Sequence, residues 1–167
     1  MNIKQRHFIQ KSQIKELQED ILKLYDEKFL NQIFPKKARV EVIQTEAGDT
    51  LYAINNVLKL WKSKDGFIPV LTLLFNKQVD LKKIVVDKGA IRFVSNNADV
   101  FRAGITEIDK SIKKGDILQI VDENNHRAIA VGKAMYNAKE MENMNEGKVI
   151  KNLLCVKSKV WNFIKHF

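Results

Sequence analysis

The residues of this chain that could perform catalysis or hold a metal are few and scattered. Its histidines, His7, His126 and His166, lie far apart in the sequence, and Cys155 is the only cysteine. Zinc sites need cysteine or histidine pairs at short spacing, and no such pair occurs. Gly-x-Ser-x-Gly, the Walker sequence and Gly-x-Gly-x-x-Gly are also absent. The sequence therefore predicts no enzyme, no metal and no cofactor, with His126 in a solvated loop and Cys155 in a buried apolar run.

The stretch Lys88-Gly89-Ala90 has residue types that suit a phosphate contact. Asp87 before it can cap a helix, and the first turn of a helix carries free N–H groups and partial positive charge. Gly89 and Ala90 would leave those donors uncovered, while Lys88 and Arg92 add charge. Alternatively, Gly89 lets the helix start pack tightly on a strand, and from these residues alone this second interpretation is favoured.

A second unusual segment is the run from Ala128 to Met135. If it is a strand, Ala128, Ala130, Gly132 and Ala134 share one face, because side chains alternate across a sheet. A face of small residues allows a very close approach. We favour a neighbouring helix as the group that approaches, with a ligand as the alternative.

The charge of the chain points to a polyanionic partner. It has 29 Lys+Arg against 20 Asp+Glu, a net charge of +9, and the excess is +3 over residues 1–75 and +6 over residues 76–167. Such a balance is typical of nucleic-acid binding, with a lysine-rich proteome as the alternative explanation. Neither a secretory signal nor an apolar run of membrane-spanning length is evident, so we expect a cytoplasmic protein without membrane contact.

The first half of the sequence predicts one helix and a small antiparallel meander. Ser12 can cap an amphipathic helix that reaches about Ile33 and stops before Pro35. Alternating residues and turn signals then predict strands, which are followed by a short helix. The expected strands cover residues 6–10, 39–44, 51–54, 57–61 and 67–70, and the short helix covers residues 72–75.

The second half predicts more strands with two short helices. One helix runs from Lys88 to about Ser95, and Asn137 with Glu140 begins the other as a capping box. Strands are expected at residues 100–103, 117–121, 127–135, 149–156 and 160–164. We therefore predict an α+β chain: residues 1–80 form a small α/β domain with a helix and a meander, and residues 81–167 form a pseudo-barrel of mostly antiparallel strands.

Four motifs in this second half resemble the PUA domain, an RNA-binding module. They are V-D-K-G-A-I-R-F-V, A-D-V-F-R-A-G-I, G-D-I-L-Q-I-V and A-I-A-V-G-K-A, in matching order between Val85 and about Trp161. In the first half, L-N-Q-I-F-P-K-K and G-F-I-P-V-L-T-L-L resemble the domain that precedes PUA in the malignant T-cell-amplified sequence family of translation factors. The composition also suggests an archaeal source.

The resemblance implies a non-enzymatic RNA-binding protein of the translation apparatus. Its expected ligands are small-subunit rRNA and the acceptor end of tRNA, its expected role is to assist initiation or recycling, and its implied partner is a translation factor with a SUI1-type domain. The RNA-binding surface that the resemblance implies comprises Lys88, Gly89, Ala90, Arg92, Asn97, Arg102, Gly104 and Lys133. One departure is Asn97-Ala98, where many PUA domains have Gly-Gly or Gly-Ala. Asparagine tolerates the left-handed conformation that ends a helix, so we expect Asn97 to preserve the turn.

Two other functions remain open. The chain could be a protein adaptor that acts through its first domain, with Trp61 and Phe67 as exposed candidates between Lys62 and Lys64, although core packing of both aromatics is favoured. It could also be the RNA-targeting accessory subunit of an RNA-modifying enzyme, because it is too short to include a catalytic domain of its own.

Overall fold

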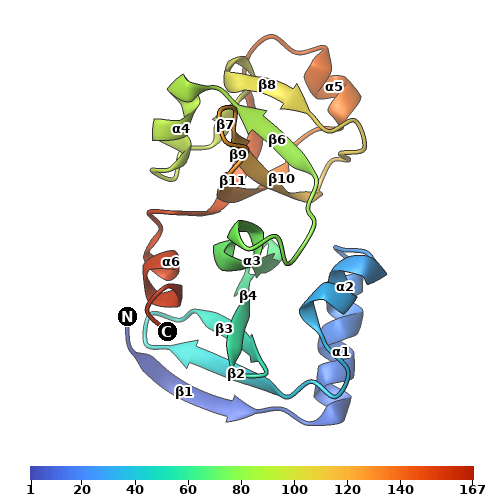
Figure 1. Ribbon diagram of the computed structural model, residues 1–167, viewed down its shortest axis with the longest axis vertical. Helices are drawn as coiled ribbons and strands as arrows, with labels where there is room; N and C mark the ends of the chain where they lie inside the picture. The colour runs from blue at the N-terminus through green and yellow to red at the C-terminus, as the bar shows by residue number, and fades with distance from the viewer. The chain divides into compact units, whose positions relative to one another are not determined.

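The computed structural model describes residues 1–167, which divide into two compact units. The first contains Met1–Val79 and Phe163–Phe167, and the second contains Asp80–Asn162. Each unit has its own sheet and short helices (Figure 1). This mixture of helices and mostly antiparallel strands confirms the predicted α+β class.

The sheet of the first unit is an antiparallel meander with strand order β1-β2-β3-β4-β5. Its hairpins form where the sequence carries turn residues: Asn55 and Asn56 adopt positive φ values of 51° and 68°, which suits a two-residue hairpin loop. The strands are β1 (Ile3–Phe8), β2 (Val40–Thr45), β3 (Thr50–Ile54), β4 (Val57–Ser63) and β5 (Gly66–Pro69).

The predicted first helix is two helices. Helix α1 (Lys11–Leu22) begins two residues earlier than expected, with Gln10 rather than Ser12 as its N-cap. The chain then leaves the helical conformation, and the Asp26 carboxylate accepts a hydrogen bond from Phe29 N at 2.8 Å, which starts α2 (Glu27–Ile33).

Two side chains tie these helices and the first strand to the sheet. Tyr25 stacks on Phe29 with 3.9 Å between ring centroids and donates its hydroxyl to Phe67 O at 2.5 Å. Burial raises the pKa of this hydroxyl. Arg6 on β1 donates two hydrogen bonds to the Glu41 carboxylate on β2, at 2.7 and 2.9 Å. These bonds hold the pKa of Glu41 below its usual value, so β1 is anchored by a charged pair.

The aromatic residues considered for an adaptor role belong largely to the packing of the first unit. Phe67 is buried and contacts the Tyr52 ring edge-on, with 5.7 Å between centroids. Trp61 is half-buried and donates its indole N–H to Asp49 at 3.0 Å. Core packing is therefore confirmed for Phe67. The short helix that follows the meander is α3 (Leu71–Phe75).

The second unit is built on a sheet with strand order β7-β11-β10-β9-β6-β8. All neighbouring strands are antiparallel except β6 and β9, which run parallel. This confirms a sheet of mostly antiparallel strands. The strands are β6 (Lys83–Val86), β7 (Val100–Phe101), β8 (Ile105–Ile108), β9 (Ile117–Asp122), β10 (Ala128–Ala134) and β11 (Lys148–Cys155).

Both helices predicted in this unit are present: α4 (Lys88–Val94) and α5 (Ala138–Glu142). Two strand predictions need correction. The strand expected over residues 100–103 ends at Phe101, and a 3₁₀ turn, η1 (Arg102–Gly104), follows it. Residues 160–164 form helix α6 (Lys159–Ile164) instead of a strand, because Val160, Trp161 and Ile164 are buried at helical spacing.

The small residues of β10 allow close packing between strands. A Cβ atom added to Gly132 would lie 2.5 Å from Ile150 Cγ2 and 2.9 Å from Lys151 O, both on β11. Ala130 and Ala134 belong to the buried apolar core of the unit. The groups closest to Gly132 itself come from the neighbouring strands, while helix α4 also approaches β10, as predicted for this face. No ligand is needed to explain the small residues.

Candidate nucleic-acid interface

Helix α4 exposes two basic side chains and buries its apolar face. Asp87 caps it by accepting a hydrogen bond from Ala90 N at 2.8 Å, which confirms the predicted cap. Val94 is buried, while Lys88 and Arg92 are exposed. The period of 3.6 residues places these cations away from the core, where they can contact a polyanion.

The close approach that the sequence suggested at Gly89 occurs instead at Gly104. Gly89 is exposed, and an added Cβ would meet only the Asp87 carboxylate, at 3.4 Å. A Cβ on Gly104 would lie 3.0 Å from the Ala90 Cβ, and Asp87 N donates to Gly104 O at 2.9 Å. The η1 turn therefore packs directly on the start of α4, whereas Gly89 leaves open space.

Carboxylates satisfy N–H groups in the first turn of α4. Glu123, from the β9–β10 loop, accepts a hydrogen bond from Lys88 N at 2.9 Å, and Asp87 accepts from Ala90 N. Two negative groups thus lie at the helix start, where the sequence suggested bare donors. Those two backbone donors are therefore occupied, and the exposed side chains of Lys88 and Arg92 supply the positive charge of this helix.

Arg102 is bonded to the backbone of its own unit. Its Nε donates to Met141 O at 2.6 Å and its Nη1 donates to Ile105 O at 3.2 Å, while Arg102 N donates to Gly147 O at 2.8 Å. The side chain thereby joins η1 to the end of α5. The structure therefore gives Arg102 a structural role within the unit, in addition to its predicted place in the RNA-binding surface.

The turn between α4 and β7 is fixed from β11 by two side chains. Asn152 donates from its amide nitrogen to Val94 O and Ala98 O, both at 2.9 Å. Cys155 donates from its buried thiol to Asn97 Oδ1 at 3.0 Å. Asn97 adopts a φ of 71°, the left-handed conformation expected for it. The turn is therefore held in one conformation before any ligand binds.

Lys133 lies apart from the other predicted residues in the sheet. It sits on β10, opposite Ile117 on β9 and Lys151 on β11. Because β11 separates β10 from β7, the sheet does not bring Lys133 next to η1. The structure thus places Lys88, Gly89, Ala90, Asn97, Arg102 and Gly104 on or around α4 and η1, with Arg92 on the exposed side of the helix.

Two exposed phenylalanines of this unit were missed from the sequence. Phe93 on α4 is 63% exposed and Phe101 on β7 is 51% exposed. The Lys148 amine lies 5.9 Å from the centre of the Phe101 ring and 3.6 Å from the Asp99 carboxylate. Strand alternation could have revealed Phe101, because its neighbour Val100 faces the core. An exposed aromatic beside a cation suits stacking on a nucleobase.

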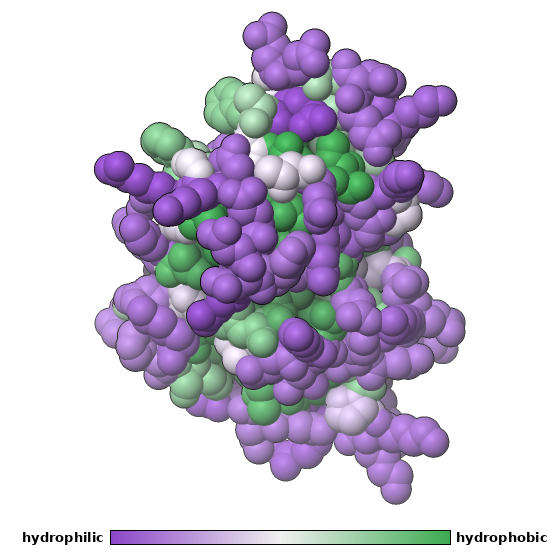
Figure 2. Space-filling model, turned by 45° about the horizontal axis from the view of Figure 1, so that its top comes forward, coloured by the Kyte–Doolittle hydropathy of each residue, from purple (hydrophilic) through white to green (hydrophobic).

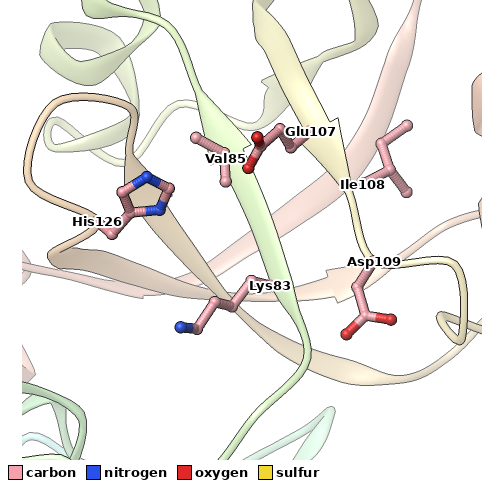
Figure 3. A pocket seen from close by; sticks show the side chains of 6 residues that line it. All are labelled: Lys83, Val85, Glu107, Ile108, Asp109 and His126. Atoms are coloured by element: carbon pink, nitrogen blue, oxygen red, sulfur yellow. The ribbon is translucent and has the colours of Figure 1, made fainter.

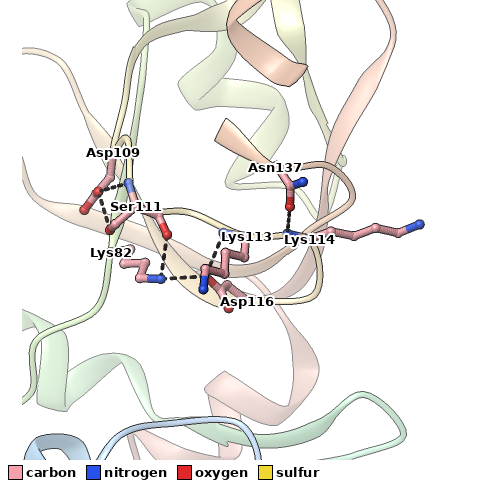
Figure 4. A network of polar contacts seen from close by, with 7 residues as sticks. All are labelled: Lys82, Asp109, Ser111, Lys113, Lys114, Asp116 and Asn137. Atoms are coloured by element: carbon pink, nitrogen blue, oxygen red, sulfur yellow. Dashed lines mark hydrogen bonds and ion pairs between the residues drawn. The ribbon is translucent and has the colours of Figure 1, made fainter. Parts of the chain in front are cut away.

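Lysines of the β8–β9 loop take part in a polar network (Figure 4). Lys82 donates to Ser111 O at 2.8 Å and to Asp116 at 2.7 Å, and Asp116 also accepts from Lys113 N at 2.8 Å. Lys114 N donates to Asn137, the N-cap of α5, at 2.8 Å. Lys82 is thus engaged in holding the loop, while the Lys114 side chain extends away from it (Figure 4).

An open pocket of about 490 Å³ lies beside β6 and β8. Carboxylates, a histidine and a lysine surround it without converging on one point (Figure 3). The pocket is lined by Lys83, Val85, Glu107, Ile108, Asp109 and His126. No group of three or more metal-binding side chains gathers there or elsewhere in the chain. His126 is exposed, in agreement with a solvated loop position.

The surface of the molecule is mainly hydrophilic. Figure 2 shows hydrophilic residues over most of the visible face, with hydrophobic residues gathered in small patches between them. No helix is long and apolar enough to cross a membrane.

Comparison with known families matches the two halves of the chain to two domain families, in the order in which the motifs of those domains occur in the sequence. Residues 1–77 match the Pre-PUA-like domain and residues 82–155 match the PUA domain. A solved structure, hypothetical protein PH0734.1 from Pyrococcus horikoshii, aligns with a TM-score of 0.82 at 28% identity and covers 96% of this chain and 99% of its own. A PUA domain protein (APE0525) from Aeropyrum pernix aligns at 0.83 with 20% identity over 96% and 91% of the two chains, a similarity of fold.

Relatives at the sequence level cover most of the chain. An uncharacterized protein of Methanocaldococcus jannaschii, MJ1432, is 37% identical over 98% of this chain and 99% of its own. Translation machinery-associated protein 20 of Saccharomyces cerevisiae is 29% identical over 82% and 79%. Malignant T-cell-amplified sequence 1 of Rattus norvegicus is 30% identical over 81% and 77%. The chain therefore belongs to the family of PUA-domain proteins that includes translation machinery-associated protein 20 and the malignant T-cell-amplified sequence proteins, as its motifs predicted.

Proposed function

We propose that this chain is a non-enzymatic RNA-binding protein of the translation apparatus, acting in the cytoplasm. It binds small-subunit rRNA, the acceptor end of tRNA, or both, and assists initiation or recycling. The PUA domain and the names of the relatives, which place those proteins with the translation machinery, support this role. Residues 1–80 and 81–167 are its two proposed domains.

The observation that carries the proposal is the exposed face of α4. Lys88 and Arg92 extend from a helix whose opposite face is buried, and Phe93 adds an exposed aromatic ring. Cations supply most of the affinity for a phosphate backbone, and an aromatic ring can stack on an unpaired base. The turn after α4 is already fixed by Asn152 and Cys155, so binding does not incur the entropy cost of ordering it.

Replacing both cations tests this surface. The double variant Lys88→Ala/Arg92→Ala should weaken binding to tRNA and to small-subunit rRNA. It should also reduce the slope of log affinity against log salt by about one to two, because two phosphate contacts are lost. Fluorescence anisotropy at several salt concentrations measures both quantities. Arg102 is left intact, because its removal would disturb the fold.

The matched control is Lys110→Ala/Lys139→Ala, which removes the same charge from exposed positions outside α4. If both double variants lose RNA affinity equally, then affinity depends only on net charge, and the proposal that α4 binds the RNA is wrong. Sequencing RNA cross-linked to the protein in cells then separates tRNA ends, rRNA and mRNA as ligands.

A translation factor with a SUI1-type domain is the proposed protein partner. This part of the proposal rests on the family resemblance. Co-purification of such a factor with the full chain, with the RNA removed by nuclease, tests it. Recovery of an RNA-modifying enzyme in its place would favour an accessory role in RNA modification.

A further inference from the structure

Strand β1 is an open edge of the first sheet. It pairs only with β2, and each of its six side chains is exposed. A long edge strand presents a row of backbone groups that can pair with another chain. Ile3 and Phe8, near its two ends, are 38% and 49% exposed, so the edge also offers apolar contacts.

The register identifies which backbone groups of β1 are available. Gln5 to Phe8 pair with Gln44 to Glu41 in one continuous register, and Ile9 N donates to Val40 O at 3.0 Å in the same register. In antiparallel pairs, every second residue directs its N–H and C=O to the partner strand. Since Ile9 is directed to β2, so are Gln5 and His7, and the backbone groups of Arg6 and Phe8 face the open edge.

The charge around this edge is positive. The chain from Met1 to Ser12 contains Lys4, Arg6, His7 and Lys11 and no acidic residue. Arg39 lies 4.5 Å from the centre of the Phe8 ring, and Arg6 lies 5.4 Å from that of Phe167. Two carboxylates lie nearby: Glu41 is 5% exposed and already paired with Arg6, and the exposed Glu46 accepts a hydrogen bond from the Asn2 amide at 3.1 Å, just before β1 begins. The cations without a carboxylate partner among these contacts, Lys4 and Lys11, keep the balance of the edge positive.

These features select one occupant over the others. Pairing of two copies through β1 would oppose like charges, which is unfavourable between adjacent strands. RNA phosphates could contact the cations but cannot continue a backbone ladder. We propose that β1 binds an extended acidic segment of a partner protein, which adds to the sheet as a further strand beside Gln5–Phe8. Strand addition takes affinity from main-chain hydrogen bonds and specificity from side chains.

A short synthetic peptide tests the proposal on the full chain. The probe is a fluorescein-labelled peptide of about eight residues that alternates glutamate and valine, the usual length of a strand. We expect saturable binding by anisotropy and slower amide hydrogen exchange at Arg6 and Phe8, with Gln5 and His7 unchanged because they are already bonded to β2. The same peptide with alternate backbone nitrogens methylated should not bind.

Charge reversal gives a second measurement without disturbing the fold. Lys4→Glu/His7→Glu changes two exposed side chains of β1 and should weaken peptide binding roughly tenfold. Lys36→Glu/Lys64→Glu, at exposed turns of the same unit, should leave binding within about twofold.

Several outcomes would overturn the proposal. Equal binding of the methylated peptide, or of a lysine–valine peptide, would exclude acidic strand addition. So would an absence of binding, or protection of Arg6 and Phe8 by tRNA in place of the peptide. The Lys88→Ala/Arg92→Ala variant should retain peptide binding, so a failure here and a failure of the RNA-binding proposal can be told apart.

Discussion

The outer face of α4 and the segment that follows it carry similar residues in opposite situations. Arg92 and Gly89 on α4 are exposed, and a Cβ on Gly89 would meet little else. On η1, Arg102 donates to the carbonyl oxygens of Met141 and Ile105, and Gly104 packs against Ala90. The motifs that resemble the family contain both sets, in V-D-K-G-A-I-R-F-V and A-D-V-F-R-A-G-I.

From this difference we propose that the residues on α4 contact the RNA and that those on η1 support the fold around them. An exposed arginine can exchange water for phosphate at little cost to the fold. An arginine whose N–H groups already satisfy carbonyl oxygens cannot contact a ligand with those groups without leaving the carbonyls unpaired. The comparison predicts that substitutions in the two regions separate RNA affinity from stability.

The largest expected effect is that of Arg102→Ala. Loss of the bonds to Met141 O and Ile105 O should lower the free energy of unfolding by about 2–4 kcal/mol, since bonds from charged groups are among the stronger ones. Arg92→Ala should change it by less than about 0.5 kcal/mol, as is usual for an exposed side chain. Urea denaturation measures both. An Arg102→Ala protein of native stability that no longer binds RNA would show that Arg102 is a ligand contact after all.

The two glycines offer a smaller contrast. Gly104→Val adds branches where a Cβ would already lie 3.0 Å from Ala90 Cβ, so overpacking should cost about 1–3 kcal/mol. A Cβ on Gly89 would lie 3.4 Å from the Asp87 carboxylate, an ordinary contact, so Gly89→Val should alter stability by less than about 0.5 kcal/mol. Thermal melts of the two variants under identical conditions compare them. Equal destabilisation would mean that Gly89 also supports the fold.

Local signals in the sequence predicted much of this arrangement. The Asp87 cap, the left-handed Asn97 and the start of α5 at Asn137 all depend on residues within a few positions of each other. Residue chemistry decides such features before any tertiary contact forms. The motifs around them then identified the family.

The errors arose where distant contacts decide. The bonds from Arg102 to Met141 and from Lys88 N to Glu123 join residues more than 30 positions apart, so neither the fastening role of Arg102 nor the covered helix start was visible from spacing. The missed break before α2 has a different cause: Asp26 caps that helix locally, three residues before Phe29, but the apolar pattern continues across the break and hides it. Long-range hydrogen bonds leave no periodic trace in a single sequence.

The smallest expected effect concerns Asn97, where many PUA domains have glycine. Its φ of 71° suits glycine equally, and its amide oxygen turns inward to accept a hydrogen bond from the Cys155 thiol, a weak donor. Asn97→Gly should therefore change stability by less than about 0.5 kcal/mol and RNA affinity by less than about twofold. Asn97→Ala keeps the positive φ but has neither the conformational freedom of glycine nor the bond to Cys155, so it should lower the free energy of unfolding by about 1 kcal/mol. Anisotropy and urea denaturation measure the pair, and a marked gain in RNA affinity for Asn97→Gly would show that the asparagine side chain restricts the approach of the RNA backbone.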